Sequence, residues 1–418
     1  MNRIAIFADI HFGRFARSKD FAVPGQIIQD KSAGDKPMGD GLDDLLSKMQ
    51  PTHIFLAGDL TSVGKPEEFY YCEKKILAMA EKIGVEIENI ICSLGNHDVD
   101  WEIARIADDK MEHELNSGGY ESMSDEVHAC IRKGYQKLAS SVALQNLNSI
   151  IRTKINNEGP LPCTGICEKE EFVVFILNTG FFCIKEQLYP HGKLSEEQLE
   201  WFAEMTLKYK DDPRKKIVLM HHHPFNYPYP TPAADISALE EGAEFVKLAI
   251  KGNIDIVVHG HRHHPYVTTI QNDESEKPIT FMCAGSLAVN TNHRSNGDIP
   301  NMVHFLDVDK NKDYFVLHNF QYTGIEGWKP VQYSKGTLMD SVMRVGKIFS
   351  KEDRVAAINT IKDRKDDFAE VEWEDLDESL KFMSYAELNR LFKSTLKETD
   401  IIANDFPEKV VVVRRPMK

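Results

Sequence analysis

The sequence of 418 residues has no long uninterrupted apolar run. Its N-terminal stretch, MNRIAIFADIHFGR, holds a short apolar segment that ends at Asp9. A secretory signal needs a longer apolar stretch followed by a small-residue cleavage site. No other stretch approaches the ~20 apolar residues of a membrane-spanning helix. We therefore expect a cytoplasmic chain.

Cysteine is scarce, and an excess of basic charge is missing. The seven cysteines are scattered without paired C-x-x-C motifs, which is typical of reduced thiols. With 50 basic against 65 acidic residues the formal net charge is −15. The chain therefore lacks the overall excess of positive charge that is typical of proteins that bind long nucleic acids. An anionic substrate remains compatible with this charge, because bound divalent metal ions are often the largest local charges in a site.

Buried-strand and amphipathic-helix patterns alternate along the first part of the chain, which is typical of an α/β fold. We expect strands at 3–8, 53–57, 89–94, 172–177, 216–220 and 255–259, and helices at 41–49, 66–83, 195–209 and 237–251. Four later strand patterns alternate more strictly and favour antiparallel pairing; they lie at 265–270, 278–283, 302–308 and 313–320.

The chain is too long for a single core, since cores usually stop growing at roughly 250–300 residues. We expect a catalytic domain at 1–325, with a helical insert at about 101–150, and a mostly helical C-terminal unit at 326–418. The predicted elements of that unit are helices at 337–349, 351–363 and 384–396 and a strand at 409–413. Its role, in substrate choice or oligomerisation, is left open.

Polar side chains of metal-binding type follow the predicted strands again and again. In chain order they are Asp9 and His11, then Asp59, then Asn96, then the run His221–His223, and finally His261 and His263. Ligands of open α/β sheets bind at the carboxyl ends of the strands. These separated segments therefore predict one shared site.

The residue types indicate the chemistry of that site. Carboxylate, imidazole and amide donors without thiolate suit Mn²⁺, Fe²⁺, Zn²⁺ or Ni²⁺. Seven candidates, with one histidine taken from the run 221–223, are too many for one ion with an open position, but they suit two divalent ions that share a carboxylate. Such a pair supplies hydroxide near neutral pH, which can attack a phosphoester.

The motifs D-x-H, G-D, G-N-H-D, H-x-P and G-H-x-H, in this order, resemble those of the calcineurin-like metallophosphoesterase superfamily. The resemblance covers roughly residues 1–325. It implies a four-layer αββα sandwich, in which two packed mixed sheets are flanked by helices. It also implies one metal on Asp9, His11, Asp59 and His263, and a second on Asp59, Asn96, His222 and His261.

Within this resemblance, His97 faces the substrate as a proton donor to the leaving oxygen, and Asp98 orients it. The choice of His222 among three consecutive histidines rests on the H-x-P spacing, which counts two places back from Pro224. Alternation at a strand end turns His221 and His223 to the opposite side.

The substrate class is indicated less sharply. The segment GDLTSVGKPEEF resembles the cyclic-nucleotide phosphodiesterase branch, whereas DIHFGR, with Arg14, is also similar to the repair-nuclease branch. Arg14 and Arg262 are candidate substrate-binding residues. The expected function is a phosphodiesterase that uses a metal-bridging hydroxide, on a phosphoester substrate such as a nucleotide. The alternatives are a nuclease, a phosphomonoesterase, and a non-catalytic scaffold; the metal and the oligomeric state are not determined.

Overall fold

The computed structural model describes residues 2–28, 37–100, 159–161, 163–181, 183, 192–226, 237–271, 277–290, 299–331, 339–362, 368–372, 375–395, 399–402 and 409–414. The predicted helical insert at 101–150 lies outside the described residues. None of the helices that the structure describes is long and apolar enough to cross a membrane.

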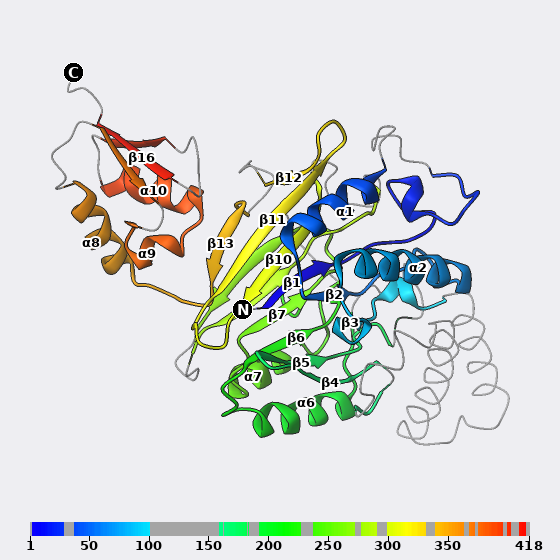
Figure 1. The fold of residues 1–418 in the computed structure, drawn as a ribbon. Helices are drawn as coiled ribbons and strands as arrows, with labels where there is room; N and C mark the ends of the chain where they lie inside the picture. Colours follow the sequence, from blue (N-terminus) through cyan, green and yellow to red (C-terminus); the bar gives the residue numbers. More distant parts are fainter. Residues whose placement is uncertain are drawn as a thin grey trace.

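The first of two large mixed sheets has seven strands (Figure 1). They are β1 (Asn2–Phe7), β2 (His53–Ala57), β3 (Ile90–Ser93), β10 (Asn301–Val308), β11 (Phe315–Thr323), β12 (Gly327–Pro330) and β13 (Val342–Val345). The order is β12-β11-β10-β1-β2-β3, and β13 also pairs with β11. β1, β2 and β3 run parallel to one another, so all three end at the same edge of the sheet. β10 pairs antiparallel with β1 on one side and with β11 on the other.

The second sheet has six strands. They are β4 (Gly165–Glu168), β5 (Phe172–Ile176), β6 (Lys215–Leu219), β7 (Ile256–His259), β8 (Tyr266–Ile270) and β9 (Ile279–Cys283), in the order β4-β5-β6-β7-β9-β8. β5, β6, β7 and β9 are parallel, while β4 and β8 pair antiparallel at the two edges. The antiparallel pairing predicted for 278–283 is confirmed on the β8 side of β9, whereas on its other side β9 continues the parallel series from β7.

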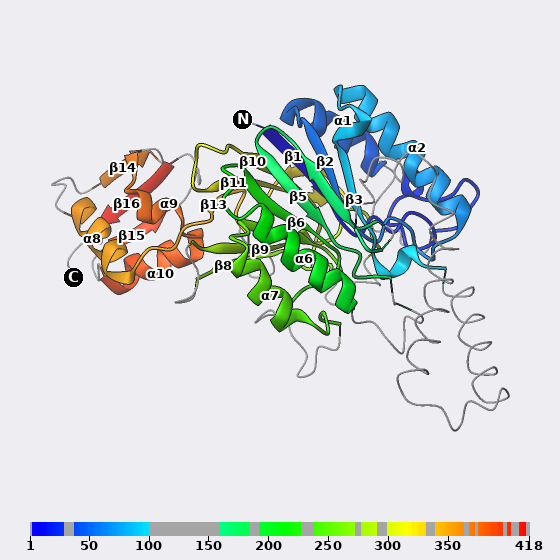
Figure 2. The same ribbon diagram turned by 90° about the horizontal axis from the view of Figure 1, so that it is seen from below.

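Helices cover the outer faces of both sheets and complete four layers (Figure 2). α1 (Met38–Met49) and α2 (Pro66–Ile83) lie on the first sheet, and α6 (Glu196–Lys208) and α7 (Gly242–Lys251) lie on the second. α2 begins at a proline and ends at Gly84, whose left-handed φ of 72° closes the last turn. At the start of α6, Ser195 accepts a hydrogen bond from the Gln198 amide, as its capping pattern predicts.

Side-chain alternation in β6 separates the two hydrophobic cores. Ile217 and Leu219 belong to the core between the sheets, whereas Val218 and Met220 belong to the core under α6 and α7. Residues of odd number on this strand therefore face the other sheet. The same alternation decides which histidine after β6 faces the predicted metal site.

The C-terminal region differs from the prediction. Residues 337–349 form no helix in the part that the structure describes; they contain β13, which pairs with β11. Beyond it lie α8 (Lys351–Lys362), α9 (Glu378–Lys381), α10 (Tyr385–Thr395) and a three-stranded antiparallel sheet of β14 (Phe368–Glu372), β16 (Lys409–Arg414) and β15 (Thr399–Ile402). This unit is thus a mixed α/β unit rather than a mostly helical one. Short charged sequences such as FAEVE become strands because they pair with β16.

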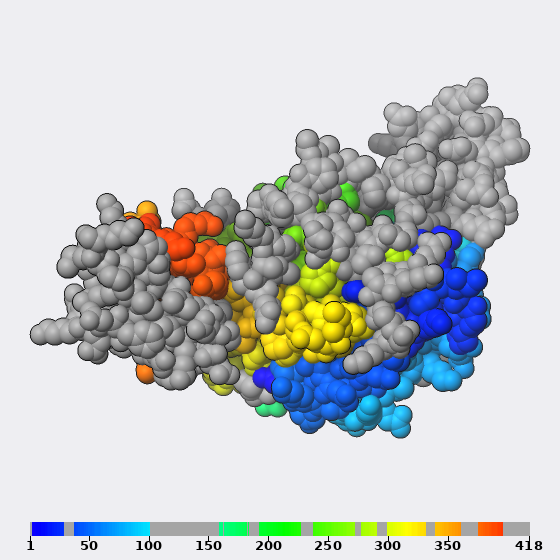
Figure 3. Space-filling view, turned by 90° about the horizontal axis from the view of Figure 1, so that it is seen from above, coloured from blue at the N-terminus to red at the C-terminus, as the bar shows by residue number. Residues whose placement is uncertain are grey.

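The C-terminal unit lies at one end of the molecule (Figure 3). Lys347 forms ion pairs with Asp313 and with Glu378, both at 2.9 Å, and the rings of Tyr314 and Phe382 pack edge to face. Asp313 and Tyr314 directly precede β11, at the end of the sheet where β1 begins. These contacts are therefore remote from the carboxyl ends of β1 and β2, where the predicted ligands lie.

Candidate metal centre

The loops that carry the predicted ligands have left-handed backbone conformations. Asp9, His11, Asp59, His261 and His263 all have φ between +49° and +72°. Residues with a Cβ adopt this region at a cost of about 1–3 kcal/mol each, and such strain clusters at functional sites. The five residues follow three different strands, β1, β2 and β7, so the strain is concentrated at one edge of the sandwich.

Glycines provide the space into which the ligand side chains fit. A Cβ on Gly95 would clash with the Asp59 carboxylate, and one on Gly260 would clash with the carboxylate of Asp9. Gly58 has a φ of +78°, and a Cβ there would clash with the ring of His221. The glycine of each G-D, G-N-H-D and G-H-x-H motif is thus required by close packing against a candidate ligand.

A first donor cluster consists of Asp9, His11, Asp59 and His263, with one donor atom of each within 4.8 Å of the others. His11 Nε2 lies 3.0 Å from His263 Nε2 and 3.5 Å from Asp59 Oδ2. His263 Nε2 lies 3.2 Å from Asp9 Oδ1. Donors held about 2.0–2.2 Å from one ion stand about 3.0–3.5 Å apart, so this spacing fits a divalent metal ion.

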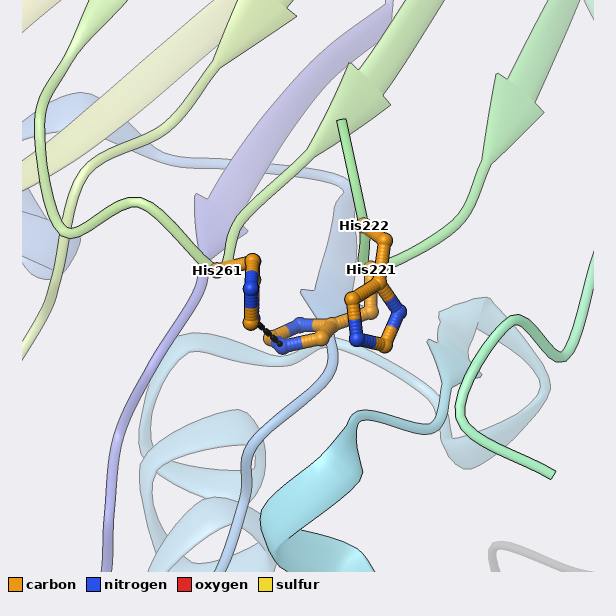
Figure 4. Close-up of side chains that lie close together, drawn as sticks. All are labelled: His221, His222 and His261. Carbon is orange, nitrogen blue, oxygen red and sulfur yellow. Dashed lines mark hydrogen bonds between the residues drawn. The ribbon is translucent and has the colours of Figure 1, made fainter. Parts of the chain in front are cut away.

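A second donor group contains His221, His222 and His261 (Figure 4). His221 Nε2 and His261 Nδ1 are 3.2 Å apart, and the side-chain oxygen Oδ1 of Asn96 lies 3.2 Å from the first and 3.1 Å from the second. His221 Nε2 also lies 3.2 Å from Asp59 Oδ2. The spacing again fits one divalent ion.

Asp59 belongs to both clusters. Its Oδ2 faces His11 on one side and His221 on the other, while its Oδ1 accepts the amide hydrogen of His97 at 2.8 Å. The residue is 1 % exposed. This one carboxylate therefore connects the two donor clusters and fixes the loop after β3.

The structure directs His221, rather than the predicted His222, toward Asp59 and Asn96. His221 continues the face of Ile217 and Leu219, which looks toward the first sheet. The Nδ1 of His222 instead lies 2.8 Å from Thr179 Oγ1, and its Nε2 lies 4.0 Å from the sulfur of Cys183. Counting back from the proline does not show where β6 ends, so it selects His222, which belongs to the same donor group but lies beside Thr179.

His97 lies beside the first cluster, with its ring centroid 4.5 Å from that of His11. Its Nδ1 lies 2.8 Å from the carbonyl oxygen of Ser62. A carbonyl only accepts hydrogen bonds, so Nδ1 carries the proton and Nε2 is the nitrogen that can take up or release another. The ring is therefore oriented by a backbone carbonyl.

Asp98 has a different role from the predicted one. Its carboxylate accepts hydrogen bonds from the Thr61 amide at 2.9 Å and the Gly95 amide at 3.0 Å, and the Thr61 hydroxyl lies 3.1 Å away. Burial, and then the charge of Asp59, raise the pKa of Asp98 to about 6. Asp98 thus joins the loops after β2 and β3, instead of holding the imidazole of His97.

The two arginines named from the sequence lie differently. Arg14 is exposed, with its guanidinium 4.6 Å over the ring of Phe15, and that ring lies 5.9 Å from His97. Arg262 is half-buried between two candidate ligands. Burial, and then the charge of Arg262, lower the pKa of His223 to about 3. Arg14 therefore lies on the His97 side of the centre, whereas the charge of Arg262 acts on His223, whose ring centroid lies 5.9 Å from that of His261.

Glu68 and Ser62 hold the loops of the site together, and the sequence reasoning did not single them out. Glu68 is 3 % exposed, accepts the Val63 amide at 2.8 Å and lies against Gly13, so it joins the loops after β1 and β2. Burial raises its pKa to about 7. Ser62 donates to the carbonyl oxygen of His11 at 2.7 Å. The second glutamate of GKPEEF, on a helix next to the G-D motif, was the available signal for Glu68.

Burial and the charge of Asp59 decide the protonation of the imidazoles in the centre. Burial alone would raise the pKa of Asp59, but His221 and His97 hold it well below its usual range. Burial opposes protonation of His221, yet the Asp59 carboxylate raises the pKa of that imidazole to about 9. Burial lowers the pKa of His11 and of His261, which keeps both in the neutral form that binds metals. The donors present therefore fit a pair of divalent ions.

Comparisons with known proteins place this arrangement in a family. No curated protein sequence matches the chain. Among solved structures, a dimetal phosphatase from Danio rerio is similar at 11 % identity with a TM-score of 0.42, covering 76 % of this chain and 95 % of that one. A purple acid phosphatase from yellow lupin (Lupinus luteus) is similar at 13 % identity with a TM-score of 0.47, covering 83 % of this chain and 54 % of that one.

A family model described as calcineurin-like phosphoesterase matches residues 2–265. This range runs from β1 through the loop after β7 and includes both donor clusters. The two mixed sheets with outer helices are consistent with the α/β metallophosphoesterase fold. The chain therefore belongs to the calcineurin-like phosphoesterase family.

Proposed function

We propose that this protein hydrolyses phosphodiesters with the help of two bound divalent metal ions. The observation that supports this most directly is the position of Asp59 Oδ2, 3.5 Å from His11 Nε2 and 3.2 Å from His221 Nε2. A single carboxylate oxygen shared by two donor clusters is what a pair of adjacent cations requires.

The proposed ligand sets follow from the donor distances. Asp9, His11, Asp59 and His263 would hold one ion, and Asp59, Asn96, His221 and His261 would hold the other. His221 replaces His222 in this assignment. Mn²⁺, Fe²⁺, Zn²⁺ and Ni²⁺ all suit imidazole, carboxylate and amide donors.

The chemistry is in-line hydrolysis without a covalent enzyme intermediate. When bound, the two ions lower the pKa of water and stabilise the negative charge that develops on the phosphoryl oxygens. His97 is proposed as the general acid. With Nδ1–H directed at the Ser62 carbonyl, the imidazolium form has Nε2–H as the donor for the departing oxygen.

The preference for diesters rests on the segment GDLTSVGKPEEF, which is similar to the cyclic-nucleotide phosphodiesterase branch. In this segment Thr61 and Glu68 hold the loop that bears Asp59 against its two neighbouring loops. The segment thus helps to determine the shape of the centre, where substrates would be distinguished. The net charge of −15 disfavours a nuclease that binds long strands.

A substrate panel on the full-length protein tests the proposal. The protein is loaded in turn with Mn²⁺, Zn²⁺, Ni²⁺ and Fe²⁺, and assayed with bis(p-nitrophenyl) phosphate, p-nitrophenyl phosphate, cyclic nucleotides and single-stranded oligonucleotides. We expect a higher kcat/KM for the diester than for the monoester. A faster monoester reaction contradicts the diester preference, and efficient oligonucleotide cleavage favours a nuclease.

Matched asparagine variants provide the control. Asn96→Ala removes a proposed ligand and should lose most of the activity with the fold retained. Asn311→Ala, on an exposed loop, should remain fully active. Full activity of Asn96→Ala, with an unchanged melting temperature, would contradict the metal assignment.

A further inference from the structure

A cavity of about 400 Å³ opens at the amino ends of β6, β7 and β9. The donor clusters lie at the opposite, carboxyl ends of β6 and β7. Lys215 lines the cavity, and His221 is six residues further along nearly extended chain, or about 20 Å away at about 3.3 Å per residue. The cavity is therefore separate from the metal centre.

The walls of this cavity are cationic, although the chain as a whole is acidic. Five cationic and three acidic side chains line it, an excess of two positive charges: Lys210, Arg214, Lys215, Lys216 and Lys277 against Asp211, Asp212 and Asp255. The formal net charge of the whole chain is −15. A local excess of cations on such a chain favours an anionic ligand.

The ammonium of Lys215 forms no hydrogen bond within the part of the chain that the structure describes. It is 7 % exposed, and its Nζ lies 5.2 Å over the ring of Phe315. Its nearest acidic group is Asp255, whose Oδ1 is 3.8 Å away. That distance is beyond a hydrogen bond, and none is formed by this ammonium with the residues that the structure describes.

The carboxylate of Asp255 is already used by other donors. Its Oδ1 accepts from Lys277 Nζ at 2.7 Å, and its Oδ2 accepts from the Lys216 amide at 2.8 Å. Two lysines thus face one carboxylate. Among the described side chains, Lys215 therefore has only the 3.8 Å ion pair with this shared carboxylate, which leaves the hydrogens of its ammonium available to an anion.

The other cations make the walls rigid. Arg214 forms hydrogen bonds with Asp212 and Glu168, and Lys216 Nζ donates to the carbonyl oxygen of Asp212 at 3.1 Å. Burial lowers the pKa of both Lys215 and Lys216, so an anion in the cavity would stabilise their charged forms.

Two further carboxylates, those of Asp309 and Asp313 on a neighbouring loop, act to raise the pKa of Lys215. Asp309 accepts the Asn311 amide at 3.0 Å, and Asp313 is paired with Lys347. Both therefore have partners of their own, and neither comes within ion-pair distance of the Lys215 ammonium among the described contacts.

We propose that this cavity binds a phosphate group, as inorganic phosphate or as part of a small phosphomonoester. A phosphate dianion offers several acceptor oxygens, so it can accept hydrogen bonds from Lys215 and Lys277 at the same time. The volume of about 400 Å³ is within the usual range for small-molecule sites and leaves room for an organic group beside the phosphate. The site does not depend on the proposed catalytic function.

Calorimetric titration of the full-length protein tests this site. The protein is first treated with a chelator, so that phosphate cannot bind through metal ions at the other end of the sheet. Inorganic phosphate and glycerol 3-phosphate are titrated separately. We expect saturable binding with one site per chain; tighter binding of the phosphomonoester would show that the organic group also makes contacts.

Lysine variants connect the binding to the cavity. Lys215→Met keeps the buried stem and removes the charge, and it should weaken binding by about tenfold or more. Lys277→Met, at a more exposed position, should weaken it as well and serves if Lys215→Met does not fold. Lys48→Met, on the exposed face of α1, is the matched control and should bind like the wild type.

Two results would overturn the proposal. The first is an absence of saturable binding of either ligand to the folded, chelator-treated wild-type protein. The second is equal binding by the wild type, Lys215→Met and Lys277→Met, because the phosphate would then be held elsewhere.

Discussion

Replacement of His221 and of His222 should affect metal binding very differently. His221 Nε2 lies 3.2 Å from both Asp59 Oδ2 and Asn96 Oδ1, whereas the Nδ1 of His222 lies 2.8 Å from the Thr179 hydroxyl. His221→Ala would leave the second cluster with three donors. His222→Ala would leave its four proposed donors in place.

The magnitude follows from the number of donors. Structural zinc sites with four ligands bind with roughly 10–16 kcal/mol, so one ligand accounts for about 3 kcal/mol, or about a hundredfold in affinity. His221→Ala should therefore weaken the second metal site by about a hundredfold. His222→Ala removes an imidazole that lies against Thr179 and outside the proposed ligand set, and it should weaken the site by less than about tenfold.

Competition between the protein and a coloured chelator measures both affinities for Zn²⁺ or Mn²⁺, and elemental analysis of dialysed samples gives the number of ions per chain. Thermal melting of each variant shows that the fold is retained. If His222→Ala loses an ion and His221→Ala does not, the reasoning from strand alternation is refuted, and the H-x-P spacing was the better guide.

The remaining predictions concern proton transfer and stability. His97→Ala should retain both metal ions and lose about 10²–10⁴-fold in kcat for diesters with alkyl leaving groups, but much less for p-nitrophenyl esters, whose leaving group needs no proton; an equal loss for both classes would count against a general acid. Burial raises the pKa of Asp340 to about 6, so the folded protein keeps a proton there that the unfolded chain releases above about pH 4, and the stability from this group falls as the pH rises from about 4 to 6. Asp340→Asn keeps an acceptor for the Tyr385 amide and should stabilise the protein by up to about 3 kcal/mol at pH 7.5 and little at pH 4, which urea unfolding at the two pH values would check. Burial lowers the pKa of His53 to about 4, so the stability that this neutral imidazole gives is complete above about pH 6.5 and is lost as the pH falls toward 4; His53→Gln should flatten the acid limb of a stability–pH curve.

Much of the fold was predictable from the sequence because local patterns and tertiary structure agree. The buried runs at 53–57 and 255–259 correspond to β2 and β7, and the helix predicted at 66–83 is α2. The helix predicted at 337–349 was wrong. This segment has a helical pattern of apolar residues, but its backbone pairs with β11. Pairing with a distant partner outweighs local periodicity in such short strands.

The residue types of the candidate site were predictable from the sequence, but the orientation and the partners of individual side chains were less so. The order of the motifs brought Asp9, Asp59 and His261 to one edge, since parallel strands deliver their carboxyl ends together. The face presented by His221 depends on where β6 ends to within one residue. The partners of Asp98 depend on loops that meet only in three dimensions.

Both oxygens of the Asp59 carboxylate make contacts that fix its position. Its Oδ2 stands between imidazoles from two loops, and its Oδ1 receives the amide hydrogen of the proposed proton donor. Lengthening the side chain by one methylene, as in Asp59→Glu, would push against the space that Gly95 leaves open and displace both contacts together. At this position, even a chemically identical functional group on a longer side chain would be out of place.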